Sequence, residues 1–481
     1  MLCWLSSDVI RSGFCRSFFW GEALMFKDQY FFFCSLILLC FFSSSAVVYW
    51  FFANSWLEQQ RIFELLMILC ALFSFLCLGH VRIDSGVCKL WVGIFLIGAI
   101  SSVFSRYPVW AGYEWSKSVG LFFLFLMGGR FFSEKKFQIA ALAVMVLLSL
   151  FLAYQFSLFY VMAFLSGVLD LNPYLLYPGF DNPRFYSQVL IVLLPLVIYV
   201  AALLAEKGRP LVASIVFLVC VIQWGLLIAL AGRGSWLAVA LASVVGFLFF
   251  SAFYRFFLLH LFTVVGGFFL YLFLFWLIPW YLELSQDFPT ALRSGLSARE
   301  LLWSKALEMA FANPLLGVGP MHFSAEWNHI AAHPHQMVLQ WAAEWGIPAT
   351  IIGVFLISLG MWRGFQYIRT STSATELDVA IWISLCSALV LAQVDGVFVM
   401  PFTEGWLAIV AGVALARWSN SQPLSGAHVV ALKMIAIPAL LVVCYLLFVE
   451  APQVYQKQIL FFEVEKIGSP PRFWDQGWIP M

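Results

Sequence analysis

The polar stretch 281–345 holds the residues that are best suited to acid–base chemistry. It contains four of the seven histidines, namely His322, His329, His333 and His335. In the run HPHQMVLQWAAEWGIP, Pro334 suits the first position of a helix and Gly346 suits its end. This pattern predicts that His335 lies in the first helical turn, where the helix dipole favours a neutral imidazole. A neutral imidazole can act as a general base. The alternative is a histidine that only caps the helix through local hydrogen bonds.

The same predicted helix has one polar face. Gln336, Gln340 and Glu344 follow one another at steps of four residues, which brings side chains to the same side of a helix. We therefore expect Gln336 and Glu344 to contact substrate near His335. A metal site is the alternative, but the histidines and acids here lack ligand-like spacing. The sequence predicts no metal and no cofactor.

Three arginines lie at predicted helix starts or turns. Arg233 stands between two glycines before an apolar run, and Arg184 lies in GFDNPRFYSQ before another. Arg299 follows Ser297, which with Glu300 has the spacing of a capping box, so Arg299 belongs to a helical first turn. Guanidinium groups beside free backbone N–H groups suit phosphate. Each arginine alone has a structural alternative at the membrane surface. The three together with a histidine indicate a diphosphate pocket.

Two acids flank the short polar run DGVFVMPFTE between two apolar segments. These acids are Asp395 and Glu404. Either can orient a base or an acceptor, and either can instead pair with an arginine. We expect Asp395 to belong to the binding site.

The composition identifies the elements that must position these residues. Of the 481 residues, 63% are hydrophobic and 11% are charged, whereas a soluble domain has about a quarter charged residues. This excludes a soluble enzyme, and the net charge of +1 gives no signal for nucleic acid. A lipid bilayer is therefore the expected environment. The sequence predicts an all-α polytopic membrane protein.

Apolar runs of about 20 residues are long enough to cross a bilayer as helices. The sequence has thirteen candidates, of which two are short, so 12 or 13 transmembrane helices are expected. Their approximate limits are 30–53, 62–80, 87–104, 115–129, 137–164, 187–205, 211–230, 235–253, 256–280, 347–362, 378–397, 404–417 and 432–449. We expect one membrane domain over 1–481, with the loop 281–345 folded into short helices and a short tail at 450–481.

Lys and Arg predict the orientation of these spans. If the N-terminus is cytoplasmic, every short loop on that side carries Lys or Arg, as the positive-inside rule requires. The loop 281–345 and the three arginines then lie on the outer face. With thirteen spans, the C-terminal tail lies there too.

Three motifs in this order resemble the O-antigen ligase and O-antigen polymerase superfamily, which includes bacterial protein O-oligosaccharyltransferases. They are GRGSWLA, RELLWSKALEMAFANPLLGVGPMHF and HPHQMVLQWAAEWGIP. The resemblance covers roughly residues 170–410. In two places the chain departs from the family pattern: Gln336 follows the histidine where Asn is usual, and Gly232 precedes the arginine where Ser is frequent.

The resemblance implies a metal-independent, inverting glycosyltransferase in the bacterial inner membrane. Its donor would be a glycan on undecaprenyl diphosphate, used at the periplasmic face. Arg233 and Arg299 match the family arginines that hold the diphosphate, and His335 matches the histidine that deprotonates the acceptor hydroxyl. Arg184 and Asp395 match the pattern less closely.

Alternative functions remain open at this point. The acceptor that we favour is lipid A core, which would make the protein an O-antigen ligase. The alternatives are a second lipid-linked glycan, which defines a polymerase, and a protein hydroxyl. A lipid-linked glycan transporter or flippase is the alternative of another class. Transporters place ionisable groups deep in the membrane, whereas most charges of this chain lie near the ends of the predicted spans.

Overall fold

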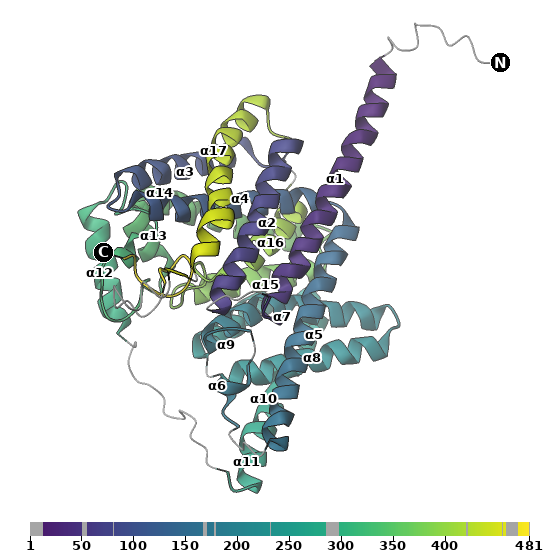
Figure 1. Cartoon of the computed structure of the whole chain (residues 1–481). Coiled ribbons are helices and arrows are strands. Elements are labelled where there is room, and N and C mark those ends of the chain that lie inside the picture. Colours follow the sequence, from purple (N-terminus) through teal and green to yellow (C-terminus); the bar gives the residue numbers. More distant parts are fainter. Residues whose placement is uncertain are drawn as a thin grey trace, which may run out of the picture.

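The computed structural model consists of helices packed into one bundle with a smaller helical cap at one end (Figure 1). It describes residues 13–50, 55–79, 81–166, 171–177, 179–230, 232–284, 298–419, 422–454, 456–457 and 470–480, with side chains from Gln29 onward except that of Tyr174. The regular elements within these ranges are all helical, which confirms the predicted all-α membrane class.

The helices of the bundle overlap the predicted apolar segments. The first segment, predicted over 30–53, is helical only as far as Ser44; residues 45–50 are not helical, and 51–54 lie outside the described residues. The bundle helices are α1 (Gly13–Ser44), α2 (Trp56–Leu78), α3 (Ser85–Phe104), α4 (Pro108–Phe131), α5 (Lys135–Leu165), α7 (Pro183–Glu206), α8 (Pro210–Ala229), α9 (Arg233–Phe249), α10 (Tyr254–Leu272), α14 (Ile347–Thr370), α15 (Glu376–Leu391), α16 (Pro401–Trp418) and α17 (Gly426–Tyr445). Short elements complete the chain: α6 (Pro173–Leu176), η1 (Ser251–Phe253), η2 (Phe273–Leu277), α11 (Ile278–Tyr281), α12 (Arg299–Ala312), η3 (His322–Ala325), α13 (Met337–Trp345) and η4 (Leu446–Glu450).

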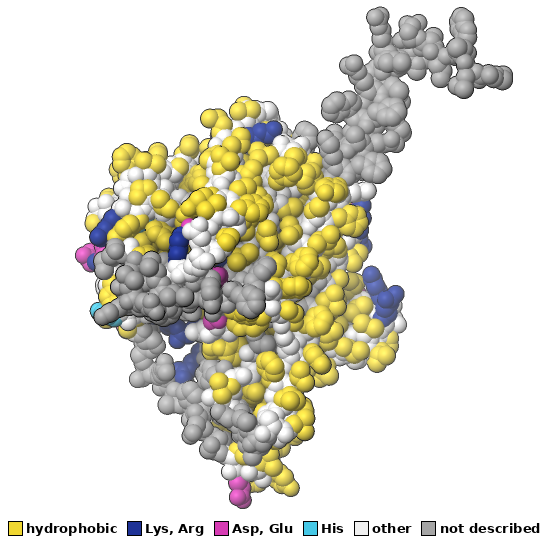
Figure 2. Space-filling model, in the orientation of Figure 1, with side chains coloured by type: hydrophobic (Ala, Val, Ile, Leu, Met, Phe, Trp, Pro, Cys, Tyr) yellow, Lys and Arg dark blue, Asp and Glu magenta, His cyan; other side chains and the backbone are white. Residues whose placement is uncertain are grey.

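Within the described ranges, eight helical stretches are long and apolar enough to cross a bilayer. A helix satisfies its backbone hydrogen bonds internally, which is why such apolar segments adopt it in lipid. Figure 2 shows hydrophobic side chains over much of the visible surface. The total of 12 or 13 crossings stays a prediction.

Polar contacts divide the bundle into two ends. We call the first of these the site end. There the backbone N–H of Leu57, at the start of α2, donates to Asp181 just before α7 (2.9 Å). The N–H of Tyr107, just before α4, donates to His322 of the cap (2.9 Å). At the opposite end, Arg417 of α16 pairs with Asp378 of α15 (2.6 Å). By these contacts, α2, α4 and α7 begin at the site end, while α15 begins and α16 ends at the opposite end.

The cap is formed by α12, η3 and α13. Figure 1 shows α12 and α13 at the left flank of the bundle, next to α14, and the bond from Tyr107 to His322 joins the cap to the site end. Short helices within 281–345 were expected, and 298–345 has them, while 285–297 lie outside the described residues. Leu302, Phe323 and Ala343 form a small apolar core within the cap. The backbone N–H of Met337 donates to the carbonyl of Ala392 at the end of α15 (2.9 Å). The cap is thus fixed directly to the bundle.

Candidate active site

His335 lies in a turn of the cap just before α13. The helix begins at Met337, and the Gln336 side chain caps it by accepting a hydrogen bond from the backbone N–H of Leu339 (2.5 Å). The prediction that His335 belongs to the first helical turn is therefore wrong. Its φ of +54° is left-handed and incompatible with a continuing right-handed helix. The expectation that a first-turn position in a helix favours a neutral imidazole therefore does not apply to His335, whose ring is placed by the turn before α13.

The imidazole of His335 faces the carboxylate of Asp395. Nδ1 of His335 lies 3.4 Å from Oδ1 of Asp395, and the two side chains are 17% and 10% exposed. Asp395 belongs to the turn between α15 and α16, and its Oδ1 also accepts a hydrogen bond from the backbone N–H of Gly396 (2.8 Å). A proton on Nδ1 would point to the carboxylate. Nε2 is then the nitrogen that can take a proton from a substrate.

Asp395 is held in its ionised form. Burial alone raises the pKa of its carboxyl group, but the pKa is lowered overall by the neighbouring His335, the N–H of Gly396 and the charge of Arg184. An ionised carboxylate can stabilise the imidazolium that forms when His335 accepts a proton.

The ring of His333 packs against the ring of His335. The two rings are 4.0 Å apart between centroids, and the backbone N–H of His335 donates to Nδ1 of His333 (3.3 Å). Burial, followed by the positive charges of His335, Arg472 and Arg184, lowers the pKa of His333. A neutral His333 can accept this hydrogen bond, whereas a doubly protonated ring cannot. His333 was not among the predicted site residues, although its place two residues before His335 was a signal in the sequence.

Two of the predicted arginines are close enough to Asp395 to interact electrostatically with it. Arg184 is the second residue of α7, which Asn182 caps (2.9 Å to the N–H of Arg184). Arg299 is the first residue of α12. Its pKa is lowered by burial and by the charge of Arg184, against the opposing effect of Asp395. Arg184, Arg299 and Asp395 therefore influence one another electrostatically.

The start of α12 differs from the predicted capping box. Ala298, with a φ of +60°, occupies the cap position, and Ser297 lies outside the described residues. Arg299 is nevertheless in the first turn, where it was expected.

Arg233 is the first residue of α9, and its backbone lies beside the turn that carries Asp395. A Cβ added to the next residue, Gly234, would lie 3.1 Å from Cδ1 of Leu391 and 3.5 Å from Cγ2 of Val394. Gly234 therefore permits close packing of α9 against the end of α15. The side chain of Gln336 also contacts this region, since its Nε2 donates to Oε1 of Gln393 (3.0 Å).

Glu344 is the predicted binding residue that the structure does not bring to His335. Its side chain is 1% exposed and forms an ion pair with Arg472 (2.8 Å). It also accepts hydrogen bonds from the backbone N–H of Phe323 (3.0 Å) and from Gln340 (3.3 Å). The polar face of α13 therefore points into the protein, where its acid is fully occupied.

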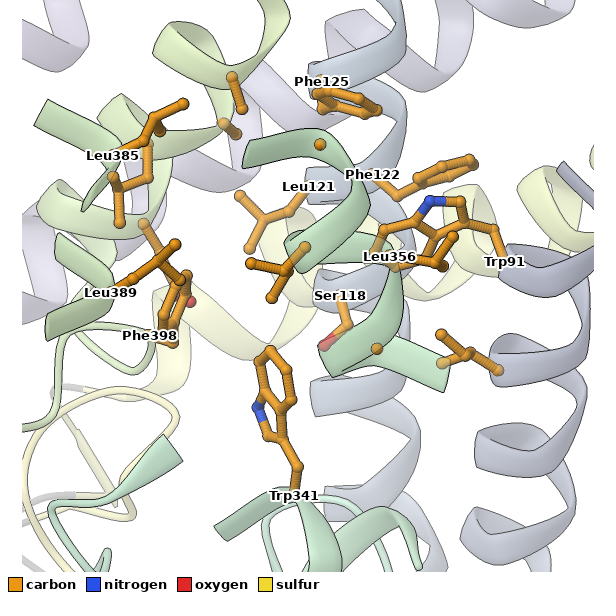
Figure 3. Close-up of a pocket in the computed structure, with 18 of the residues that line it drawn as sticks. Trp91, Ser118, Leu121, Phe122, Phe125, Trp341, Leu356, Leu385, Leu389 and Phe398 are labelled. Atoms are coloured by element: carbon orange, nitrogen blue, oxygen red, sulfur yellow. The ribbon is translucent and has the colours of Figure 1, made fainter. Parts of the chain in front are cut away.

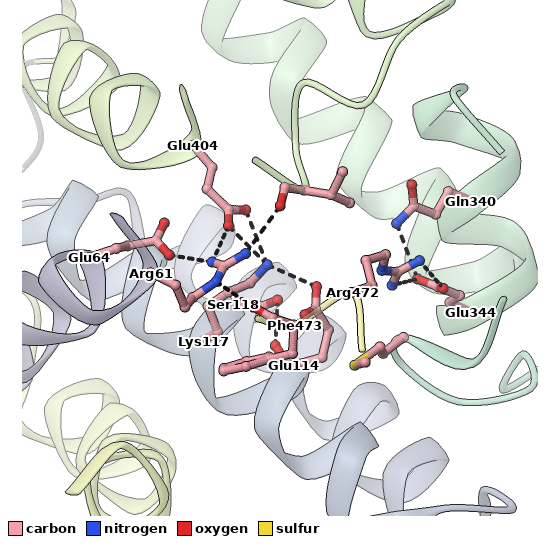
Figure 4. Close-up of polar contacts among 12 residues, drawn as sticks. Arg61, Glu64, Glu114, Lys117, Ser118, Gln340, Glu344, Glu404, Arg472 and Phe473 are labelled. Carbon is pink, nitrogen blue, oxygen red and sulfur yellow. Dashed lines mark hydrogen bonds and ion pairs between the residues drawn. The ribbon is translucent and has the colours of Figure 1, made fainter. Parts of the chain in front are cut away.

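A network of buried charges lies in the bundle near the site end (Figure 4). Arg61 of α2 pairs with Glu64 and with Glu404 of α16, and Lys117 of α4 pairs with Glu114 (3.0 Å) and Glu404 (3.1 Å). Of the two roles considered for Glu404, pairing with an arginine is the one observed. Arg61 and Glu64, like Glu114 and Lys117, are three residues apart in the chain, and this spacing was the signal that the sequence analysis missed.

An apolar cavity of about 420 Å³ opens beside the cap (Figure 3). Trp341 of α13 and Phe398, three residues after Asp395, line the part that adjoins the cap, and Leu121 and Leu356 line it further along α4 and α14. Lys117, Glu344 and Glu404 also contribute to its wall. Such a space fits an apolar chain better than a sugar. Among the residues with described positions, no three His, Cys, Asp or Glu side chains are grouped closely enough to hold a metal ion.

Fold and site together define a polytopic membrane protein with a histidine–aspartate pair beside arginines at one end of its bundle. Residues 216–354 match the sequence model of the O-antigen ligase family, so the chain contains the domain of that family, and the resemblance seen in the motifs is confirmed. The match covers less than a third of the 481 residues but includes Arg233, Arg299 and His335. Over this segment the chain is therefore similar to membrane enzymes of the O-antigen ligase and polymerase type. Comparisons with curated proteins and with solved structures found no match.

Proposed function

We propose that this protein transfers a glycan from undecaprenyl diphosphate to an acceptor hydroxyl at the periplasmic face of the bacterial inner membrane. The acceptor that we favour is lipid A core, which makes the protein an O-antigen ligase. The observation that carries the proposal is the pairing of His335 with Asp395 at a distance of 3.4 Å, in the field of Arg184 and Arg299.

The chemistry of glycosyl transfer matches these groups. The acceptor oxygen attacks the anomeric carbon while the bond from that carbon to the diphosphate oxygen breaks. Negative charge then develops on the leaving diphosphate, and fixed guanidinium groups stabilise charge where it appears. Arg233 and Arg299 are the groups that we assign to the diphosphate, with Arg184 as a further contact. No metal ion is needed in this scheme.

The acceptor proton passes to Nε2 of His335, and Asp395 stabilises the resulting imidazolium. General-base help of this kind contributes about 10²–10⁴-fold to a rate. Because the attack comes from the side opposite the leaving group, the anomeric configuration inverts. The products are the glycosylated acceptor and free undecaprenyl diphosphate.

The apolar cavity supports a lipid-linked substrate. It begins at Trp341 and Phe398, close in sequence to His335 and Asp395, and continues between helices of the bundle. A prenyl or acyl chain in this space would keep its polar head group at the cap. Holding two membrane-bound substrates in this way lowers the entropic part of the barrier.

The test uses purified protein in liposomes with a glycan on undecaprenyl diphosphate and lipid A core as acceptor. We expect glycosylated lipid A core from the wild type and none from His335→Ala or Arg233→Ala. Glu326→Gln is the matched control, because Glu326 is an exposed acid of the cap whose partner is Lys305 (2.7 Å). Wild-type product from either active-site variant at equal protein would refute the assignment.

Gene deletion distinguishes the acceptors. Loss of all long-chain lipopolysaccharide identifies a ligase, a single-repeat band identifies a polymerase, and a faster-running glycoprotein with normal lipopolysaccharide identifies a protein glycosyltransferase. Movement of the lipid-linked glycan across liposomes without a new glycosidic bond would instead identify a transporter.

A further inference from the structure

The segment 470–480 near the C-terminus is packed inside the protein. It forms a tight turn in which the backbone N–H groups of Trp474 and Gly477 donate to the carbonyls of Pro471 and Pro470 (2.8 Å each). Arg472, Phe473 and Trp474 are at most 3% exposed. We call residues 470–480 the C-terminal clasp.

The clasp joins the bundle to the cap. On the bundle side, the carbonyl of Phe473 accepts a hydrogen bond from Nε of Arg61 (2.8 Å), and the guanidinium of Arg61 lies over the Phe473 ring. On the cap side, the backbone N–H of Ile479 donates to the carbonyl of Ser324 (2.8 Å), and Trp478 packs against Trp327. The clasp therefore holds the cap at a fixed position over the site end.

Arg472 is the residue of the clasp that reaches the histidine turn. Its two terminal nitrogens contact the two carboxylate oxygens of Glu344 (2.8 and 3.0 Å), as Figure 4 shows. One of these nitrogens also donates to the carbonyl of Ala332 (3.2 Å). Arg472 therefore binds the chain both three residues before His335 and at the last turn of α13.

The turn between these two anchor points has little freedom to relax. His333 follows Ala332 directly, and its ring lies so close to Gly396 that a Cβ there would collide with it. The N–H of His335 donates to this ring, and the side chain of His335 faces Asp395. A continuous set of contacts thus links Arg472 to His335.

We propose that Arg472 is a positioning residue, which orients His335 toward Asp395 by fixing the turn 332–335. The proposal rests on the function proposed above, because it gives the clasp a part in transfer and not only in stability. Arg472 itself contacts neither Asp395 nor the arginines assigned to the diphosphate in the hydrogen bonds and ion pairs of the described residues. Its role is therefore to place the base.

The charge of Arg472 has a second effect on this turn. The groups that act on the titration of His333 are His335 in the same turn, Arg472 in the clasp and Arg184 on α7, and all three favour the neutral ring. Loss of the Arg472 charge makes His333 easier to protonate. A protonated His333 no longer accepts a hydrogen bond from the N–H of His335. Without the Arg472 charge, the acid limb of the pH profile of kcat therefore moves to higher pH.

The test compares full-length variants in the liposome assay described above. Arg472→Met with Glu344→Gln removes the ion pair without leaving a buried charge, and Arg472→Lys keeps the charge but loses the forked geometry. The matched control is Arg417→Met with Asp378→Asn, which removes a second two-pronged ion pair at the opposite end of the bundle (2.6 Å). The readouts are kcat, the KM for the lipid-linked donor, and the pH profile of kcat.

We expect kcat to fall at least tenfold in the Met–Gln variant while the KM stays within threefold, with the acid limb moved to higher pH. Arg472→Lys should lower kcat less and keep the acid limb of the wild type, and the control should keep the wild-type kcat. Wild-type kcat and acid limb in the Met–Gln variant, or an equal loss in the control, would overturn the proposal. If the Met–Gln variant does not fold, Arg472→Lys decides, and a wild-type kcat there overturns it. Failure of the proposed function is distinguishable, because the wild type would then form no glycosidic bond in this assay, or His335→Ala would be as active as the wild type.

Discussion

Replacing Asp395 with asparagine removes one negative charge next to His335 and almost nothing else. Asparagine has the same shape, and its carbonyl can face Nδ1 of His335 as the carboxylate does. The variant therefore isolates the electrostatic contribution of Asp395 to the imidazolium that forms during transfer.

The expected size of the effect follows from the 3.4 Å between Nδ1 and Oδ1. Two unit charges at this distance interact with about 1 kcal/mol at the dielectric constant of water and about 5 kcal/mol at an effective value near 20. Since each 1.4 kcal/mol corresponds to a factor of ten in rate, this range spans roughly 10- to 3,000-fold. The two side chains are mostly buried, and general-base catalysis as a whole contributes about 10²–10⁴-fold. We therefore expect kcat to fall by about 10²–10³-fold.

The assay is glycan transfer in liposomes between pH 5 and 8. The lowered pKa of Asp395 keeps the wild-type carboxylate ionised over this range, so the ratio of wild-type to Asp395→Asn activity should not depend on its titration. Glu326→Gln serves as the control for the loss of one acid from the same end. An Asp395→Asn enzyme within threefold of the wild type would refute the idea that Asp395 stabilises the imidazolium.

Three further predictions concern packing and charge. Gly396→Ala places a methyl group against the His333 ring, which should cost about 1–3 kcal/mol of stability and lower kcat at least tenfold. The control is Gly360→Ala, where no atom lies within 4 Å of the added Cβ, and equal kcat values for the two variants would contradict the packing argument. Lys117→Met removes a positive charge that neutralises the buried carboxylates of Glu114 and Glu404, so thermal unfolding in detergent should show stability lower by about 3–5 kcal/mol. Adding Glu114→Gln should restore part of this stability. An unchanged Tm would refute the importance of the network. Burial and the negative charges of Asp181 and Glu58 raise the pKa of Asp475 from 3.8 to about 7, so its ionisation opposes folding and the free energy of unfolding falls as pH rises from about 4 to beyond 7. Asp475→Asn should therefore raise Tm at pH 8 but hardly at pH 4. An equal change at both pH values would contradict this prediction.

The helices could be predicted from the sequence because their signal is local. Each predicted apolar run overlaps a helix, and proline at positions such as 108, 183 and 401 began one. The same local reasoning failed at His335, because Pro334 suited a helix start but the Gln336 side chain provides the cap instead.

The site could be predicted only in part because its contacts join distant segments. The motifs identified His335 and Arg299, and the polar run DGVFVMPFTE identified Asp395. His335 lies 3.4 Å from Asp395, and Arg299 interacts electrostatically with the same carboxylate. The partner of Glu344 is Arg472, which is 128 residues away in the chain, and no periodicity connects the two. The amphipathic spacing of Gln340 and Glu344 indicated a polar face correctly, but it could not show whether that face meets substrate or a buried arginine.

The most direct test of His335 as the base is a single-turnover measurement on His335→Gln with the lipid-linked donor already bound. Glutamine can occupy much of the same space and form hydrogen bonds, but it cannot accept the acceptor proton at neutral pH. We predict donor binding within threefold of the wild type and transfer slowed by at least 10²-fold. Transfer at the wild-type rate would contradict the account, since the acceptor would then lose its proton without His335.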